Sequence, residues 1–488
     1  MRSTFRLGLV LAAVALFPLS AADLTATIEA KSNFGIWEGW GTSLAWWATA
    51  FGTRDDLADL FFTTKTVTIA GQALPGLGFN IARYNAGACS SSTYNGSRMV
   101  ISPKTVPSRK VQGFWIDGAS SDPTSKSWDW SVDAAQRAML EKARDRGADV
   151  LELFSNSPMW WMLNNHNPGG SPTGATDNLQ SRYHAQHAVY LATVASQLLA
   201  TRNLTFQAID PFNEPSADWW KADTGKQEGC HFSVASQASV IGHLFREIQS
   251  RPALVRAGTF ISASDETSYD SALATLNGLG ATAVSQVTRV NVHGYQYDGG
   301  RRDGLAAAVG KAGKRLWQSE YGEGDATGQR MASNMLLDFR WMRPTAWVYW
   351  QVMDGGGWGL LDSDNESKTI KAVNQKFWVL AQWARHIRPG MRVLDGGGDY
   401  VVAAYDEKRK KLVVVAVNWG NAQVVNVDLK KFGTPGVEGA VVKRWVTQIG
   451  TGGSRYAEFG DVKVSGGKFS ARFEKNAVQT FEVEGVVV

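Results

Sequence analysis

The sequence predicts an α/β fold: a (β/α)8 barrel, the TIM-barrel architecture, joined to a β-sandwich. Three observations lead to this prediction. Short apolar runs alternate with helical patterns over residues 36–387. There are eight such runs, which is the number of β-then-α units that closes a barrel. Residues 388–488 then hold short Val-rich runs separated by Gly, Asn and Lys turns, which is typical of an antiparallel sandwich.

The predicted barrel strands are short, as strands buried on both faces are. Helical patterns such as 133–147 and 182–202 separate them, and Gly147 ends the first of these as a helix C-cap would. A doubly wound open sheet is the alternative, but EGWGTSLAWW after the first strand start lacks the G-x-G-x-x-G turn that such a sheet would need. The strands are expected at 38–44, 79–84, 149–154, 208–212, 260–263, 289–292, 315–318 and 346–349.

The amino-terminal residues add two segments to this division. Residues 1–22 have the pattern of a signal peptide, because a basic start precedes an apolar run and small residues end it. The run is too short to span a bilayer, so we expect a secreted, extracellular protein. Residues 23–35 include LTATIEA, whose alternation predicts a strand donated to the sandwich. The barrel then covers 36–387 and the sandwich 388–488.

Composition excludes several kinds of partner and cofactor. The formal net charge is +5, and Lys and Arg are scattered apart from EKRKK at 407–411, which is typical of a hairpin tip. We therefore expect no nucleic-acid partner, no membrane partner and a monomeric chain. The seven histidines form no H-E-x-x-H or Cys/His cluster, and the sequence has no G-x-S-x-G elbow and no phosphate-binding loop. Neither a metal nor a cofactor is predicted.

Two acidic residues close predicted barrel strands, and function gathers at the carboxyl ends of such strands. The fourth strand is followed by Asn213, Glu214 and Pro215, and the seventh by Glu320. Carboxylates three strands apart on a closed barrel can converge across its mouth, and we expect their oxygens roughly 5 to 5.5 Å apart. A Glu before Pro is also common in surface turns, and Glu323 lies close enough in sequence to compete with Glu320.

Paired carboxylates suit the cleavage of a glycosidic bond. One must be protonated to release the leaving oxygen, and the other must be ionised to attack or to activate water. Burial raises the pKa of the first, while hydrogen bonds and a cation keep the second ionised. Arg83 closes the second strand and is the candidate cation, with a structural salt bridge as the alternative. His293 closes the sixth strand and either lines the cleft or packs in the core.

Tryptophan is the second indication of a sugar-binding cleft. The chain has 20 tryptophans, and many follow predicted strand ends. Aromatic rings stack on the apolar faces of sugars, although core packing explains many tryptophans equally well. Adjacent residues of a strand face opposite sides, so of Trp46 and Trp47 one is expected in the cleft and one in the core. The glycine-rich run 354–359 (DGGGWG) predicts a mobile loop over the cleft.

Secretion would give the cysteines and the glycosylation sequons a role. Cys89 and Cys230 are an even pair in an oxidising compartment, so a disulfide is expected, with two separate buried thiols as the alternative. Three N-x-S/T triplets, at Asn95, Asn203 and Asn365, are candidate N-glycosylation sites, although such triplets also occur by chance.

A set of segments along the chain carries a family resemblance. They are EGWGTSLAWWA, NIARYNAGAC, LFSNSPMWWM, PFNEPSADWW, QEGCHF, VHGYQY, WQSEYGEGD and VYWQ. In this order they resemble glycoside hydrolase family 30, whose members are retaining enzymes, and with the Val-rich tail they cover nearly all of the mature chain. The resemblance implies that a side β-sandwich packs on the barrel and includes the mature amino terminus.

The resemblance also implies residue roles. Glu214 matches the acid/base and Glu320 the nucleophile, while Asn213 matches the residue that binds the 2-hydroxyl of the sugar being cleaved. Arg83 and Tyr295 match positions that keep the nucleophile ionised and oriented.

Aromatic positions match as well. Trp350 matches the floor of the subsite on the non-reducing side of the cut, and Trp160 matches a cleft-lining aromatic. Trp46 and His293 complete the expected substrate-binding set.

Within the family, SEYGEGD, QEGCHF and YNAGACS look most like the secreted fungal endo-β-1,6-galactanases, whose substrate is the β-1,6-galactan side chain of arabinogalactan. This likeness places both cysteines in loops on the catalytic face. The sequence departs from the glucuronoxylan-cleaving members, because WQVMDGGGWG offers no arginine for a glucuronate. It also departs from the lysosomal glucosylceramidases, which carry an acid near the first and second strand ends that is not found here. Another family 30 β-glycosidase (β-1,6-glucanase, xylanase or exo-galactosidase) and a non-catalytic carbohydrate-binding protein are the alternatives.

Overall fold

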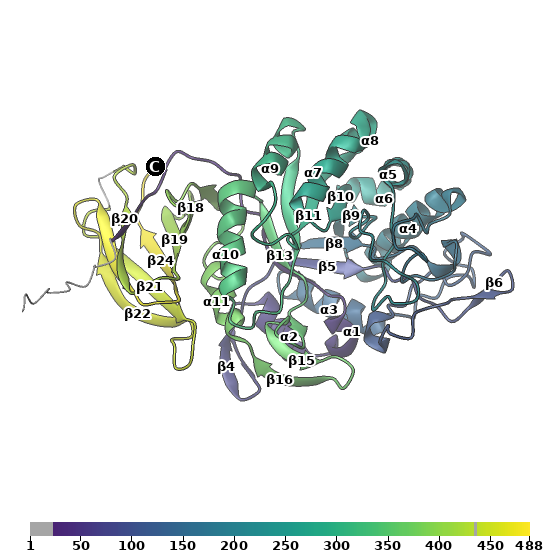
Figure 1. Ribbon diagram of the computed structural model, residues 1–488, viewed down its shortest axis with the longest axis horizontal. Coiled ribbons are helices and arrows are strands. Elements are labelled where there is room, and N and C mark those ends of the chain that lie inside the picture. The colour runs from purple at the N-terminus through teal and green to yellow at the C-terminus, as the bar shows by residue number, and fades with distance from the viewer. Residues whose placement is uncertain (1–22, 434–436) are drawn as a thin grey trace, which may run out of the picture.

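The computed structural model describes residues 23–433 and 437–488, and it contains a barrel with a β-sandwich at its side (Figure 1). The predicted signal peptide at 1–22 lies outside the described residues. Among the helices described, none combines the length and the apolar character that crossing a membrane requires.

Eight parallel strands close the barrel, and the fold class predicted from sequence is confirmed. Each predicted run falls on one of these strands, and the last strand pairs with the first, Ala346 opposite Gly39, to complete the ring. The strands are β2 (Gly39–Ser43), β5 (Ile81–Asn85), β8 (Val150–Phe154), β9 (Phe206–Asp210), β10 (Phe260–Glu266), β11 (Val287–His293), β12 (Arg315–Tyr321) and β13 (Ala346–Tyr349).

Helices cover the outside of the barrel and bury the main apolar core against the strands (Figure 1). The predicted helix at 133–147 begins at Ala134 and ends at Asp145, and Gly147 follows with φ +98°, as its C-cap prediction requires. The α-helices are α1 (Trp47–Phe51), α2 (Asp55–Phe62), α3 (Ala134–Asp145), α4 (His184–Arg202), α5 (Val234–Gln249), α6 (Pro252–Ala257), α7 (Tyr269–Gly278), α8 (Gly280–Gln286), α9 (Arg302–Lys311), α10 (Gln329–Leu337) and α11 (Gln375–Ala384). Also present are the 3-10 turns η1 (Pro107–Arg109), η2 (Trp160–Met162) and η3 (Ser181–Tyr183), and the π-helix η4 (Asp338–Met342).

The barrel interior changes from apolar to charged along the strands. Ile81 and Trp317 belong to a small buried apolar cluster inside the ring. Two residues further along β5 stands Arg83, and β8 likewise passes from Val150 to Glu152. Because side chains alternate along a strand, these residues face the same interior. The strands therefore carry an apolar plug first and a polar layer towards their carboxyl ends.

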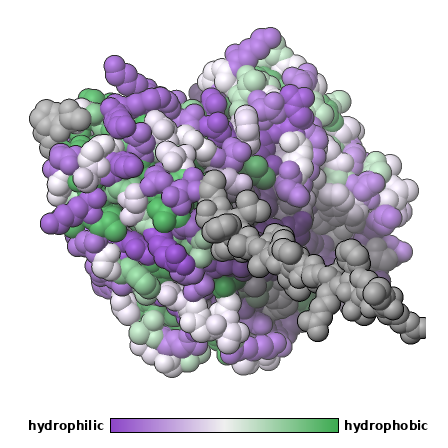
Figure 2. Space-filling model, turned by 60° about the vertical axis from the view of Figure 1, so that its left-hand side comes forward, coloured by the Kyte–Doolittle hydropathy of each residue, from purple (hydrophilic) through white to green (hydrophobic). Residues whose placement is uncertain are grey.

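The sandwich consists of two sheets that bury a second apolar cluster between them. One sheet has the order β1 (Leu24–Thr27), β20 (Gln423–Asp428) and β23 (Lys468–Phe473). The other has the order β17 (Arg392–Leu394), β18 (Val401–Asp406), β19 (Lys411–Asn418), β24 (Ala477–Glu484), β21 (Val441–Gln448) and β22 (Ala457–Lys463). Leu24 lies opposite Val425, so β1 pairs with a strand of the sandwich. Figure 2 shows this side of the molecule, where hydrophilic residues predominate and hydrophobic ones are scattered.

Three small sheets, absent from the sequence prediction, decorate the barrel. Two are the hairpins β3 (Thr66–Ile69) with β4 (Gln72–Pro75), and β6 (Thr93–Tyr94) with β7 (Ser97–Arg98). The third consists of β14 (Met353–Asp354), β15 (Leu361–Asp364) and β16 (Thr369–Val373). The glycine-rich run 354–359 connects β14 to β15, which fixes both of its ends.

Candidate active site

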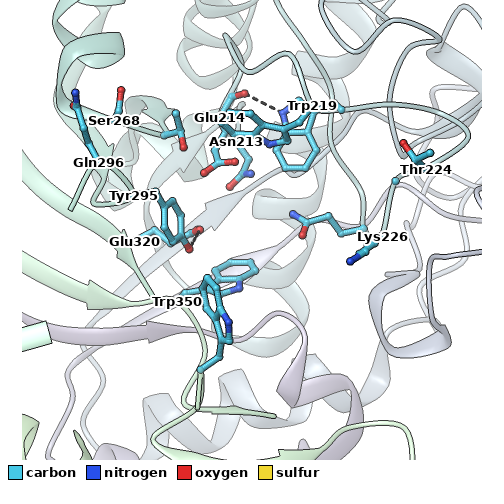
Figure 3. Close-up of a pocket in the computed structure, with 15 residues that line it drawn as sticks. Asn213, Glu214, Trp219, Thr224, Lys226, Ser268, Tyr295, Gln296, Glu320 and Trp350 are labelled. Atoms are coloured by element: carbon cyan, nitrogen blue, oxygen red, sulfur yellow. Dashed lines mark hydrogen bonds between the residues drawn. The ribbon is translucent and has the colours of Figure 1, made fainter. Parts of the chain in front are cut away.

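Glu214 and Glu320 face one cleft at the carboxyl ends of the barrel strands (Figure 3). Glu214 follows β9, and Glu320 is the penultimate residue of β12. Both line a cavity of about 690 Å³. One carboxylate oxygen of each lies within 4.8 Å of the other. This closeness favours the short carboxyl separation of ~5–5.5 Å that retaining glycosidases use over the ~6.5–9.5 Å of inverting ones.

The backbone holds Glu214 in an uncommon conformation. Its φ of 48° lies in the left-handed region, which a non-glycine residue adopts at a cost. Its N–H donates to the Asp265 carbonyl at 2.8 Å. Its own carbonyl accepts from the Ala217 N–H at 3.1 Å and from the Trp220 indole N–H at 3.0 Å. These bonds, together with Pro215, turn the chain away from β9 and leave the carboxylate in the cleft.

Three side chains surround the Glu320 carboxylate with donors. The Tyr295 hydroxyl donates to Oε1 at 2.8 Å, and Arg83 Nη1 donates to Oε2 at 3.1 Å. His293 Nδ1 lies 3.5 Å from Oε1. Burial raises the pKa of Glu320 above its ordinary value, although the charges of His293 and Arg83 oppose this rise. Removing either cation would raise that pKa further.

Arg83 is fully buried in the polar layer of the barrel interior. It bonds Glu152 Oε1 at 2.8 Å, and its guanidinium also pairs with Asp265 and Glu320. Burial alone would lower the pKa of Arg83, but these carboxylates raise it above its ordinary value. The arginine therefore stays charged, and both readings proposed from sequence hold: Arg83 is a structural ion-pair partner and contacts Glu320.

His293 lies between the two cleft carboxylates. Its Nδ1 is 3.2 Å from Glu214 Oε1, and its Nε2 is 3.4 Å from Asp265 Oδ1. Burial alone lowers the pKa of His293, but Glu320, Asp265 and Glu214 together raise it to about 10. The ring is therefore an imidazolium at neutral pH. Its side chain has no exposed surface and is absent from the cleft lining, so His293 contacts the carboxylates rather than the cleft that was expected for it.

Glu214, His293 and Glu320 are the one set of side chains in the described ranges whose donor atoms converge as a metal site would require. His293 Nδ1 lies 3.2 Å from Glu214 Oε1 and 3.5 Å from Glu320 Oε1, so the three side chains form one network of charged contacts.

Asn213 and Trp350 supply the polar and flat surfaces of the cleft (Figure 3). Asn213 is buried, and its Oδ1 has no hydrogen-bond partner among the described residues, so it can accept from a substrate hydroxyl. Trp350 packs edge-on against Trp46, with ring centroids 5.0 Å apart. Trp46 is 3% exposed and lies outside the cleft lining, so it supports Trp350 rather than offering a face of its own. Trp47 packs in the core against Phe61.

The expected cleft role of Trp160 is corrected by the structure. Trp160 has no exposed surface and is absent from the cleft lining. It belongs to the 3-10 turn η2, and its indole N–H donates to Ser90 Oγ at 2.7 Å. The turn directs both Trp160 and Trp161 into the main apolar core.

The expected disulfide is also corrected, because both cysteines are free and buried. Cys89 Sγ donates to Glu228 Oε1 at 3.3 Å, and Cys230 Sγ donates to the His231 carbonyl at 3.5 Å. Each thiol thus has a separate partner. Burial raises the pKa of both thiols, so both are protonated at neutral pH.

The remaining predicted residues have clear positions. Glu323 is buried and pairs with Lys376 Nζ at 2.8 Å. This ion pair engages its carboxylate, so Glu323 does not compete with Glu320 as the second carboxylate of the cleft. Asn95 and Asn203 are exposed in turns, whereas Asn365 is half-buried and accepts a hydrogen bond from Ser363.

Sequence reasoning missed Asp265 at the end of the fifth strand. It is fully buried and contacts Arg83, His293 and Ser319 Oγ. The signal was present in FISASDE, where an apolar strand ends in two acids. The loop 219–227 after the fourth strand supplies much of the cleft wall. Of its two adjacent tryptophans, Trp219 is 48% exposed and Trp220 is buried.

Comparison with known proteins identifies sequence relatives of this chain. The model of O-glycosyl hydrolase family 30 matches residues 20–288. An endo-beta-1,6-galactanase of Hypocrea rufa is 54% identical over 477 residues, which covers 98% of each chain.

Two solved structures share the fold. A conserved exported protein from Bacteroides fragilis has a TM-score of 0.75 at 18% identity, covering 94% of this chain and 100% of that one. The catalytic domain of a family 30 xylanase C from Talaromyces cellulolyticus has a TM-score of 0.68 at 19% identity, covering 94% and 99%. The family model spans more than half of this protein, and the fungal relative spans nearly all of it. The chain therefore belongs to O-glycosyl hydrolase family 30.

Proposed function

We propose that this protein is a secreted endo-β-1,6-galactanase that cleaves the β-1,6-galactan side chains of arabinogalactan with retention of configuration. The observation that supports the chemistry is the convergence of Glu214 and Glu320 in one cleft, with an oxygen of each within 4.8 Å. The substrate follows from the fungal endo-β-1,6-galactanase that is 54% identical over 98% of the chain.

In the first step, Glu320 attacks the anomeric carbon and forms a glycosyl ester. Glu214 donates its proton to the glycosidic oxygen as that bond breaks. Arg83 and Tyr295 orient the attacking carboxylate, because both donate to its oxygens. The buried charges of Arg83 and His293 stabilise negative charge in the site without later reorganisation.

In the second step, Glu214, now ionised, takes a proton from water as the water oxygen attacks the anomeric carbon. The ester bond to Glu320 breaks, and the sugar leaves with its original configuration. His293 contacts both carboxylates, so it can donate to whichever one carries the charge. Asn213 accepts from the 2-hydroxyl, and Trp350 forms the floor under the sugar being cleaved.

Secretion, glycosylation at Asn95 and Asn203, and a monomeric state belong to the same proposal. Residues 1–22 are the signal peptide, and the barrel at 36–387 and the sandwich at 388–488 are its two domains, with 23–35 completing the sandwich. Glycosylation at Asn365 requires its half-buried side chain to become accessible.

Product analysis tests this function. Proton NMR of the first-formed product from de-arabinosylated arabinogalactan should show the β-anomer. Analysis of product sizes should show a ladder of β-1,6-galacto-oligosaccharides. An α-anomer would contradict retention, and galactose alone would contradict internal cleavage. Reducing-end release from β-1,6-glucan and xylan, measured in parallel, should be far lower. A higher rate on either polymer would replace galactan as the substrate.

A further inference from the structure

Residues 219–227, part of the loop between β9 and α5, form a wall of the cleft that the two chemical steps do not use. Three of its residues matter here: Trp219, Lys226 and Gln227, all of which line the cavity. Trp219 is 48% exposed, whereas Trp350, the other flat ring assigned to the substrate, is 6% exposed. Trp219 therefore presents an open aromatic surface beside the acid/base carboxylate.

The position of Glu214 decides which sugar this surface meets. The general acid touches the oxygen of the leaving group, so the leaving sugar must lie on its side of the cleft. Trp219 follows Glu214 by five residues in the same loop. In Figure 3, Glu214 and Trp219 lie together at the top of the cleft, and Trp350 lies at the bottom. The two tryptophans thus serve opposite sides of the bond that is cut.

The loop is held rigidly before any ligand arrives. The neighbouring Trp220 is buried and donates from its indole to the Glu214 carbonyl. Further along the loop, the Ala222 N–H donates to the Ser171 carbonyl at 2.9 Å. Thr105 Oγ1 donates to the Gly225 carbonyl at 3.0 Å. A surface fixed in this way costs little ordering entropy when a sugar binds.

Two polar side chains that line the same cavity, those of Lys226 and Gln227, are available for a ligand. Within the described ranges, no hydrogen bond or ion pair involves the side chain of Lys226 or of Gln227. The amide of Gln227 offers two donors and an acceptor, and Lys226 offers three donors. Together with a flat ring, such groups match the apolar face and the hydroxyls of a hexose.

We propose that Trp219, with Gln227 and Lys226, binds the galactosyl residue on the reducing-end side of the bond that is cut. This inference rests on the proposed hydrolysis of galactan. Galactose has a C–H face opposite its axial 4-hydroxyl, and that face stacks on Trp219 while its edge hydroxyls bond the two polar side chains.

The test compares two substrates that differ in their leaving group: a β-1,6-galacto-oligosaccharide, which releases a sugar, and the corresponding β-galactobiosyl fluoride, which releases fluoride. The fluoride ion offers no ring for Trp219 to bind. Trp219→Ala should lower kcat/KM on the oligosaccharide about tenfold, which corresponds to about 1.4 kcal/mol of stacking, and should leave the fluoride rate unchanged. Trp219→Phe should recover most of the loss, because it keeps a flat ring.

Trp341→Ala is the matched control, because Trp341 is 46% exposed but precedes β13 at the opposite end of the barrel. It should change neither rate. Equal losses on both substrates in Trp219→Ala, or no loss on the oligosaccharide, would overturn the inference. The wild-type rates on galactan, β-1,6-glucan and xylan report separately on the proposed function. If another polymer is preferred, the effect of Trp219→Ala is compared on an oligosaccharide and a glycosyl fluoride of that sugar. The leaving-sugar site is thus tested independently of the proposed substrate.

Discussion

Glu214 and Glu320 share His293 but differ in their other partners. Glu320 accepts from Tyr295 and from Arg83, so it has donors on both oxygens in addition to the imidazolium. Glu214 has the imidazolium as its one side-chain partner in the described ranges and faces the side of the leaving sugar. This asymmetry suits an attacking anion at residue 320 and a group that gains and loses a proton at residue 214.

Substitution of the two carboxylates separates their roles. Glu214→Gln should lower hydrolysis of galactan by ~10²–10⁴-fold, the usual contribution of general acid catalysis. Its first step on a glycosyl fluoride should be affected far less, because fluoride needs little protonation. Glu320→Gln should abolish turnover of both substrates. Circular dichroism should show that both variants are folded, and unchanged turnover in either one would contradict the assignment.

Loss of the buried imidazolium should alter the pH profile. In His293→Gln, the pKa of Glu320 should rise, because a positive charge 3.5 Å from its Oε1 is removed. A smaller fraction of Glu320 is then ionised at low pH, so the acidic limb of kcat/KM should move to higher pH. A profile that only falls in height, with an unchanged limb, would show that His293 acts through packing alone.

Sequence could predict the site residues that close strands, and it failed for those whose role depends on side-chain direction. Glu214 and Glu320 follow from their positions at strand ends. Asp265 acts through contacts that cross the barrel, and such contacts have no linear pattern. Trp350 directly follows β13, whereas Trp160 lies in a 3-10 turn six residues after β8 and packs into the core.

Among the elements, the loop after β9 depends on glycines that permit close contact. A Cβ at Gly229 would lie 2.1 Å from Cε3 of Trp220, which no side chain can tolerate without movement. Similarly, a Cβ at Gly170 would lie 1.9 Å from the Trp220 carbonyl oxygen. Trp220 is therefore clamped between two glycine backbones, and its indole in turn holds the Glu214 carbonyl.

Gly229→Ala should consequently impair both stability and activity. Displacing Trp220 should cost ~1–3 kcal/mol of unfolding free energy, as overpacking usually does, and should lower kcat because the Glu214 backbone loses a bond. Gly310→Ala is the control, since that helical position is open and alanine should add up to about 1 kcal/mol there. Urea denaturation and steady-state kinetics measure both effects. Equal stability of the two variants would refute the clamp.

Element positions were the most predictable level of the structure. The barrel strands carry apolar runs between helical patterns, and the observed bounds of β13 equal the predicted ones. The small hairpins escaped prediction because their strands, such as TY and SR, are polar, partly exposed and outside the alternation of apolar runs with helical patterns. The disulfide was mispredicted because an even cysteine count says nothing about where each thiol points.

Across the whole molecule, the sandwich docks on the barrel through α11. The hydroxyl of Thr480 in β24 donates to the Gln382 carbonyl at 2.7 Å. Nearby, His386 Nδ1 donates to Glu482 Oε1 at 2.8 Å, and Lys411 Nζ bonds the same carboxylate at 3.0 Å. The main apolar core also extends into residues of β18 and β19. We therefore expect the two parts to unfold together.

The Glu482 contact makes this docking sensitive to acid. Burial alone raises the pKa of Glu482, but His386 and Lys411 lower it to about 2, below its ordinary value of 4.5. A carboxyl whose pKa is lowered by folding stabilises the fold when the pH lies above its pKa in the unfolded chain. This contribution disappears as the pH falls from about 4.5 to about 2. Glu482→Gln should therefore be less stable than wild type at pH 7, and the difference should shrink over that range.

Chemical denaturation at a series of pH values measures this difference. Glu484→Gln, an exposed change two residues further along β24, should leave stability unchanged at every pH. A Glu482→Gln deficit that persists undiminished at acidic pH would mean that the carboxylate contributes through shape rather than charge.

The pairing of β1 with β20 couples the first described strand to one some four hundred residues later in the sequence. Leu24 emerges from the ribosome long before Val425 exists, so this strand must remain without its neighbour through most of synthesis. A carboxyl-terminal truncation that removes β20 would leave β1 permanently without this partner strand. Pairing of β1 therefore requires that the sandwich has been completed. A chain that ends before β20 exposes β1 as an unpaired strand near its amino terminus.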